Sequence, residues 1–133
     1  SLAESAKQAI ATEGSAAAAD LTRVAATWNA QNDSKGATSK YVNSIQMDGT
    51  SGVITVEYNK DSVGLKEGEQ TLTLTPWVRT DATGKSLAEA IKAGETGALD
   101  WGCASKTAET AKAAKITTTA GTLQAKYAPA QCR

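Results

Sequence analysis

The first part of the chain carries a hydrophobic pattern with the spacing of one face of an α-helix. Its apolar positions recur at steps of seven, four, three and four residues, at Ile10, Ala17, Leu21, Val24 and Trp28. No proline lies in this stretch, Gly14 is its only interior weakness, and the largely polar residues 29–36 supply a stop. The pattern therefore predicts one long helix over residues 2–32.

The two halves of this predicted helix differ in the size of their apolar residues. Leu21, Val24 and Trp28 fill the C-terminal half and are expected to face the core, whereas the N-terminal half offers mainly alanine with Leu2 and Ile10. Such a helix is about 42 Å long, and ordinary strands span about 20 Å. A sheet therefore covers only the heavier half, so the N-terminal turns are expected to project or to pack on something outside the chain.

After residue 40 the pattern changes to the alternation of β-strands. One face of a first strand carries Tyr41, Ile45 and Met47, one face of a second carries Ile54, Val56 and Tyr58, and a third runs over residues 70–75. Residues 48–52 are rich in turn formers and predict a hairpin between the first two strands. In the third strand the leucines are expected to face the core and the threonines to face solvent. Pro76 lacks an N–H, which predicts the end of that strand or an edge position.

The last third of the chain adds one strand and two short helices. Leu99, Trp101 and Cys103 alternate in a fourth strand. Ser86 and Glu89 have capping-box spacing before a helix over residues 87–93, and residues 107–115 predict another. The sequence thus predicts an α+β fold, with a long N-terminal helix on one face of a four-stranded antiparallel β-sheet and solvent on the other.

Composition narrows the classes of function. The 133 residues fit one domain, and 14 basic side chains balance 14 acidic ones. Histidine is absent, which removes the commonest general base and metal ligand. We therefore expect no catalytic residues, no metal and no cofactor.

The three tryptophans differ in their expected burial. Trp28 and Trp101 follow the buried periodicity, whereas the sequence favours neither the core nor a surface contact for Trp77.

Two cysteines, Cys103 and Cys132, are the only pair in the chain. Their spacing is too wide for a CxxC redox motif, and without histidine they cannot build a zinc site. A structural disulfide is favoured over two free buried thiols. A disulfide in turn indicates an oxidising compartment: the periplasm, the cell surface or the exterior.

Four stretches in order carry a family resemblance. They are Gly52-Val-Ile-Thr-Val-Glu-Tyr58, Thr71-Leu-Thr-Leu-Thr-Pro76, Leu99-Asp-Trp-Gly-Cys103 and Tyr127-Ala-Pro-Ala-Gln-Cys-Arg133. Following an Ala-rich helix, they resemble the globular domain of type IVa pilins of Gram-negative bacteria. The resemblance implies a disulfide between Cys103 and Cys132. It divides the chain into the end of a long helix (1–32), a loop with the first strand (33–52), the rest of the sheet (53–103) and a disulfide-bounded region (103–132).

The resemblance also implies a function. The implied function is that of a structural subunit, the major pilin. It would polymerise into a surface filament for adhesion and twitching motility, with DNA uptake as a further role. Its partners would be other pilin subunits, the assembly machinery, host-cell receptors, DNA or phage. A minor pilin or secretion-system pseudopilin is one alternative, and an unrelated secreted or periplasmic binding domain is another.

Family members begin with a hydrophobic half-helix, methylated at its mature N-terminus, that anchors the subunit in the inner membrane before assembly. The sequence is accordingly expected to be a truncated piece that stays largely monomeric. Leu2, Ala6 and Ile10 would then form a helix face that packs against neighbouring subunits in the extracellular filament.

The balanced charge hides an uneven distribution. Residues 101–133 contain five basic side chains and one acidic one, Glu109, so their net charge is +4. Because the whole chain is neutral, residues 1–100 have a net charge of −4. The bases are Lys106, Lys112, Lys115, Lys126 and Arg133. Chance placement of solvated charges is one interpretation. The other is a basic contact surface, formed by the four lysines, for acidic surfaces of adjacent subunits or for DNA.

Overall fold

The structure, a computed structural model, describes all residues from Ser1 to Arg133. Its helical elements are α1 (Leu2–Ala9), the π-helical turn η1 (Ile10–Gly14), α2 (Ala18–Asn29), α3 (Gln31–Ser34), α4 (Lys60–Val63), α5 (Leu87–Ala93), α6 (Glu109–Ala113) and the 3-10 turns η2 (Ala125–Tyr127) and η3 (Ala130–Cys132). Its strands are β1 (Val42–Met47), β2 (Ile54–Tyr58), β3 (Thr71–Arg79), β4 (Lys85–Ser86) and β5 (Ala98–Ala104).

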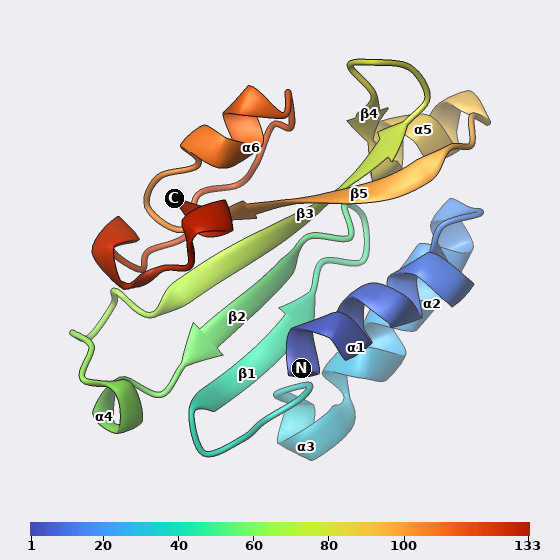
Figure 1. The fold of residues 1–133 in the computed structure, drawn as a ribbon. Coiled ribbons are helices and arrows are strands. Elements are labelled where there is room, and N and C mark those ends of the chain that lie inside the picture. Colours follow the sequence, from blue (N-terminus) through green and yellow to red (C-terminus); the bar gives the residue numbers. More distant parts are fainter.

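The strands form one antiparallel sheet, with α1 and α2 on one face (Figure 1). Strand β3 lies at its centre: it pairs with β2 through residues 71–74 and with β5 through residues 73–79. Strand β1 pairs with β2, and the two-residue β4 pairs with Trp77 and Val78 of β3. The predicted α+β fold with a helical layer on a four-stranded antiparallel sheet is confirmed, and β4 is a small addition to it.

The prediction of one continuous helix over residues 2–32 is wrong. The helix ends after Gly14, Ala17 takes extended dihedrals (φ −148°, ψ 152°), and α2 starts again at Ala18. The chain turns back there (Figure 1). As a result, Ala9 and Glu13 line one small cleft with Trp28. A straight helix leaves its lighter half outside the sheet, whereas a hairpin buries the apolar side chains of both halves in one core.

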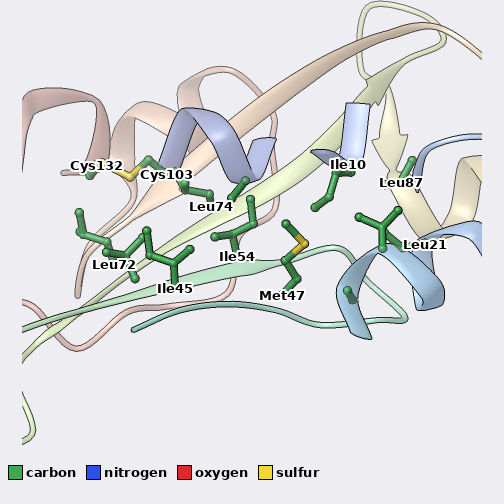
Figure 2. Packing of buried hydrophobic residues seen from close by; sticks show 14 of the residues in the cluster. Ile10, Leu21, Ile45, Met47, Ile54, Leu72, Leu74, Leu87, Cys103 and Cys132 are labelled. Atoms are coloured by element: carbon green, nitrogen blue, oxygen red, sulfur yellow. A yellow bond between two sulfur atoms is a disulfide. The ribbon is translucent and has the colours of Figure 1, made fainter. Parts of the chain in front are cut away.

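The core lies between this helical hairpin and the sheet. Figure 2 shows Ile10 and Leu21 directed toward Met47, Ile54 and the neighbouring strand residues. Ile10, Leu21 and Ile54 are each no more than 1% exposed. The two helical segments are in contact at Gly14, where a Cβ atom would lie at the ordinary contact distance of 3.4 Å from the Leu21 side chain.

Pro76 lies inside β3 rather than at its end, so the first of the two alternatives predicted from the sequence is wrong. Strand β3 continues to Arg79, and Pro76 is opposite Trp101 of β5. The Gln70 carbonyl accepts from the Tyr58 N–H, so the even-numbered residues of β3 direct their backbone groups toward β2. The nitrogen of Pro76 therefore faces the gap between the last β2 pair, at Leu74, and the start of β4. Because no strand residue pairs with Pro76 on that side, the absence of an N–H in proline costs the sheet no hydrogen bond.

The threonine face of β3 is covered, not solvated as the alternation predicted. Thr73 and Thr75 are buried, and Thr71 pairs its hydroxyl with that of Thr122 at 2.9 Å. The Thr73 hydroxyl donates to the carbonyl of Thr119. Further along this face, Trp77 is 8% exposed in a second small core with the alanines of the α6 region. Trp77 is thus a core residue, and the segment after β5 excludes water from this face.

The outer edge of β1 is occupied by side chains and backbone from residues 28–36. The Asn29 side chain accepts from the N–H of Met47 and donates to its carbonyl, both at 2.8 Å. The Trp28 Nε1–H donates to the carbonyl of Ile45 at 2.9 Å, and the Ile45 N–H donates to the Lys35 carbonyl at 3.1 Å. These contacts satisfy the backbone groups that an edge strand would otherwise offer to another chain.

Replacing Asn29 by Leu should destabilise the chain by about 1–3 kcal/mol, because it leaves both backbone groups of Met47 without a partner. It should also increase association, since the freed edge is a template for strand pairing. Thermal melts and light scattering measure the two effects. Gln31→Leu is the matched control, because the Gln31 side chain bonds only the carbonyl of Trp28. Equal behaviour of the two variants would contradict this account.

The β1–β2 hairpin is confirmed, and its turn contains a carboxylate with a lowered pKa. Asp48 accepts the backbone N–H groups of Ser51 and Thr50 at 2.8 and 2.9 Å, and these bonds, the Ser51 bond foremost, lower its pKa. Hydrogen bonds to the charged form favour it. The ionised turn is therefore most stable above the unfolded pKa of about 3.9, and this stability is lost as the pH falls through the lower folded pKa.

The Asp48→Asn variant should consequently melt below the wild type at pH 6, and the difference should shrink as the pH falls below about 4. Melting temperatures measured between neutral and strongly acidic pH give the comparison. Asp61→Asn serves as the control, because the Asp61 carboxylate accepts only from Lys60. A difference between wild type and Asp48→Asn that stays constant with pH would rule out the ionised turn as its source.

Candidate assembly and contact surfaces

The helix face predicted to meet neighbouring subunits lies inside the subunit's own core. Ala6 and Ile10 are 0% exposed, and Leu2 is half-buried against the same cluster. The reason is the hairpin turn after Gly14, which places α1 across the sheet instead of beyond it. Ala6 and Ile10 are thus core positions and Leu2 packs beside them, so the expected projection of this helix face is wrong.

The opposite face of the same helix is open. Its exposed residues are Glu4, Ser5, Gln8, Ala11 and Thr12. They are short or polar, and Thr12 donates its hydroxyl to the Gln8 carbonyl at 2.8 Å. The helical pattern in the sequence indicates this face, because the exposed residues lie on the side of the helix opposite the apolar stripe. The pattern alone does not show that the lighter stripe packs on the chain's own sheet, so it leaves open which of the two faces is free.

The predicted core face of the second half is confirmed by its burial. Leu21 is 1% and Val24 6% exposed, and both belong to the main core cluster. Trp28 is half-buried, with its indole N–H bonded to β1 as described. This half therefore attaches the helical hairpin to the sheet edge as well as to the core.

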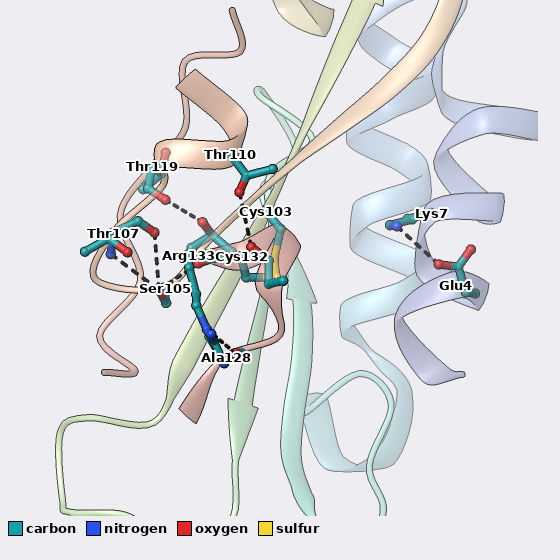
Figure 3. Close-up of a disulfide and its surroundings, with 12 residues drawn as sticks. Glu4, Lys7, Cys103, Ser105, Thr107, Thr110, Thr119, Ala128, Cys132 and Arg133 are labelled. Atoms are coloured by element: carbon teal, nitrogen blue, oxygen red, sulfur yellow. Dashed lines mark hydrogen bonds and ion pairs between the residues drawn. A yellow bond between two sulfur atoms is a disulfide. The ribbon is translucent and has the colours of Figure 1, made fainter. Parts of the chain in front are cut away.

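The cysteines form the disulfide that the resemblance implied. Cys103 lies on β5 and Cys132 in η3, with their Cα atoms 4.5 Å apart (Figure 3). The Ser105 hydroxyl and backbone N–H both donate to the Cys132 carbonyl, at 2.7 and 2.9 Å. Arg133 donates from Nε to the Ala128 carbonyl at 2.9 Å. The disulfide thus closes a segment that is also held by backbone hydrogen bonds.

Residues 105–133 form a C-terminal lobe on β3 and β5 (Figure 1). At the C-terminal end of β3, Arg79 donates to the Asp100 carboxylate at 3.0 Å and to the Ala114 carbonyl of the lobe at 2.8 Å. Just before the start of β3, the Glu69 carboxylate accepts from Gln124 of the lobe. This bond, followed by the charge of Lys106, lowers the pKa of Glu69. Polar contacts from two ends of β3 therefore fix the lobe in place.

The four lysines of the predicted basic surface all lie in this lobe, but in different surroundings. Lys106 is 3.5 Å from Glu69 and Lys112 is 3.3 Å from Glu109. Lys126 lies over the Tyr127 ring, 5.1 Å from its centroid, and Lys115 follows α6 with φ 64° and no ion pair. Exposed pairs of this kind contribute little to stability. Lys115 and Lys126 are the two without a carboxylate partner.

No group of three or more histidine, cysteine, aspartate or glutamate side chains lies close enough to hold a metal ion. None of the helices combines the length and apolar character that crossing a membrane requires. The geometry defines a disulfide-closed α+β domain whose surfaces are a polar helix face, a sheet edge covered by residues 28–36 and a basic lobe.

Comparison with known proteins places this subunit in a family. The pilin family, a family of bacterial filament proteins, matches residues 1–133, and the chain belongs to it. A crystal structure of the type IV pilin of Pseudomonas aeruginosa strain Pa110594, in space group P212121, is similar with a TM-score of 0.95 and 48% sequence identity. The match covers 99% of this chain and 90% of that one. No curated protein gives a significant match.

The resemblance seen in the sequence is thereby confirmed, together with the pilin fold and its C-terminal disulfide. The chain is a pilus subunit, and the filaments of its family place it at the bacterial cell surface. Membership of a structural family is consistent with the absence of an enzymatic role. The alternative of an unrelated secreted or periplasmic binding domain is excluded.

Proposed function

We propose that the chain is the major subunit of a type IV pilus that serves adhesion and twitching motility, with DNA uptake as a further role. The observation that carries the proposal is the match over the whole chain to a type IV pilin, at a TM-score of 0.95. Each subunit is held in the inner membrane before the assembly machinery adds it to the filament. The disulfide-closed lobe and the covered β1 edge suit a subunit that must stay separate until it is added.

The composition of filaments sheared from cells tests this proposal. If the chain is the major pilin, it makes up most of the filament protein, and deletion of its gene removes filaments and motility together. Complementation with the wild-type gene restores both. If the chain is a minor pilin or a secretion-system pseudopilin, it is a trace component, and long filaments remain after its deletion. That second result would overturn the proposal.

We further propose that the basic lobe gives the filament its attraction for DNA. The support is Lys115 and Lys126, which are exposed and lack carboxylate partners. Lysine contacts to phosphates release counterions, so binding should weaken steeply as salt rises. The competing role of these lysines is contact with acidic surfaces of adjacent subunits.

Filaments carrying Lys115→Glu together with Lys126→Glu should retain much less DNA at low salt than wild-type filaments. Lys66→Glu with Lys92→Glu is the control, because it makes the same change in net charge at exposed positions outside the lobe. DNA retention is measured from low to physiological salt. Loss of filaments with the lobe variant would assign the lysines to subunit contact instead. Equal retention by both variants would show that net charge alone matters.

A further inference from the structure

Residues 31–36 cover part of the β1 edge in a backbone conformation that side chains disfavour. Asn32 (φ 49°, ψ 58°), Asp33 (φ 57°, ψ 43°) and Ser34 (φ 66°) follow one another with positive φ, and none of them is glycine. Residues with a Cβ atom visit the left-handed region singly, as Lys115 does after α6, and not in runs, because the Cβ atom crowds the following carbonyl oxygen. The turn labelled α3 in Figure 1 is therefore under backbone strain.

The turn is closed by its own hydrogen bonds and not by core packing. The N–H groups of Lys35 and Gly36 both donate to the Gln31 carbonyl at 3.0 Å. The Asn32 side chain donates to the Gly36 carbonyl at 2.6 Å. Residues 31–35 are exposed, so the turn adds no buried apolar side chain to the core. Segments with few buried apolar contacts are those that open locally in a folded protein.

Two further hydrogen bonds attach the turn to β1. The Ile45 N–H donates to the Lys35 carbonyl at 3.1 Å, and the Gln46 side chain donates to the Ser34 carbonyl at 2.6 Å. Gly36 forms an isolated bridge with Ile45, and a Cβ atom at position 36 would lie 1.8 Å from the Ile45 carbonyl oxygen. The attachment therefore requires glycine there. The remaining bonds of this edge come from α2 and do not involve the turn.

We propose that residues 31–36 form a strained strap that opens as a unit while the rest of the fold stays intact. Opening relieves three left-handed residues and removes no apolar side chain from the core, and water can replace the hydrogen bonds that it breaks. It frees the Ile45 N–H, an edge donor that is covered while the strap is closed. The strap is thus a conformational switch at the subunit surface, additional to the filament role and independent of it.

Native-state hydrogen exchange tests the opening. After correction for intrinsic rates, the Ile45 amide should exchange at least about tenfold faster than the Met47 amide, which is held by Asn29 of α2. Low concentrations of denaturant should leave the Ile45 rate unchanged, because local opening exposes little surface. Equal protection of the two amides would overturn the proposal, as would an Ile45 rate that rises with denaturant in step with the amides of β3.

A glycine substitution isolates the strain. Asp33 is exposed and its side chain bonds no other residue, so Asp33→Gly changes chiefly the energy of the left-handed conformation. It should raise the protection of the Ile45 amide about threefold, because relief of the Cβ contact exceeds the added freedom of glycine in the open state. Asp33→Ala should lower that protection. Asp61→Gly is the matched control, since it removes an exposed aspartate from α4, where φ is not positive, and should leave Ile45 unchanged. If Asp33→Gly protects Ile45 no better than the wild type, the strap is not strained and the proposal fails.

A second variant separates the strap from the fold. Gly36→Ala places a Cβ atom against the Ile45 carbonyl and should hold the strap open. The Ile45 amide should then lose most of its protection while the amides of β3 keep theirs. Gly49→Ala is the control, because the added Cβ atom meets its neighbours at 3.5 Å or more and should leave Ile45 protected. Loss of protection in β3 together with Ile45, or no loss at Ile45, would contradict an independently opening strap.

Discussion

Replacing both cysteines by serine should lower the free energy of unfolding by about 3–4 kcal/mol. The disulfide joins residues 29 positions apart, and opening it releases a loop of that length in the unfolded chain. For a domain of this size the melting temperature should fall by roughly 10–20 °C. The loss should be concentrated in the C-terminal lobe, because the β1–β2–β3 ladder contains neither cysteine.

The lobe should loosen without unfolding completely at low temperature. Ser105 retains two bonds to the Cys132 carbonyl position, and the lobe retains its threonine contacts with β3. Limited proteolysis should therefore cleave within residues 105–133 first. Reductant supplies the control, since it should destabilise the wild type and leave the double variant unchanged. An unchanged melt with identical protease resistance would refute a stabilising disulfide.

Replacing Ile10 by Ala should cost about 2–5 kcal/mol of stability in the isolated chain. Ile10 is fully buried between the helical hairpin and the sheet, so the shortened side chain leaves a cavity that the core fills only in part. Gln8→Ala on the exposed face of the same helix is the control and should have little effect. Denaturant unfolding of the three proteins gives the comparison.

The same experiment separates two roles for the apolar stripe of α1. If the stripe served contacts between subunits, Ile10→Ala would leave the isolated chain as stable as the wild type and would impair filaments alone. If it serves the subunit's own core, the isolated chain is destabilised, and filament defects follow from poor folding. Equal stability of Ile10→Ala and the wild type would contradict the packing described here.

The covered edge of β1 bears on association between copies of the chain. An edge strand with free backbone groups is a template for pairing with another chain. At Ile45 and Met47 the contacts from Trp28, Asn29 and Lys35 occupy these groups, so this part of the edge offers no such template.

Much of the fold follows from local patterns. The alternation over residues 41–47 and 54–58 specified two strands, and the turn formers of residues 48–52 specified the hairpin between them. The capping box at Ser86 and the glycine at position 94 bounded α5 as predicted, with the Ser86 hydroxyl accepting the Glu89 N–H at 3.2 Å. The motifs around Cys103 and Cys132 carried the family and the disulfide. Each of these signals lies within a few residues of the feature that it predicts.

The tertiary structure decided what lies on either side of those elements. No proline marks the break at residues 15–17 in the sequence. The break results from the apolar burial that is gained when both helical halves pack on one core. The threonine face of β3 is predicted to be solvated because threonine suits water as well as a polar interface. The segment after β5, which is remote in sequence, covers this face through the α6 region and residues 116–122. Helical and strand periodicity state which residues share a face. What that face meets depends on segments that are remote in sequence, and the chain's own compaction settles it.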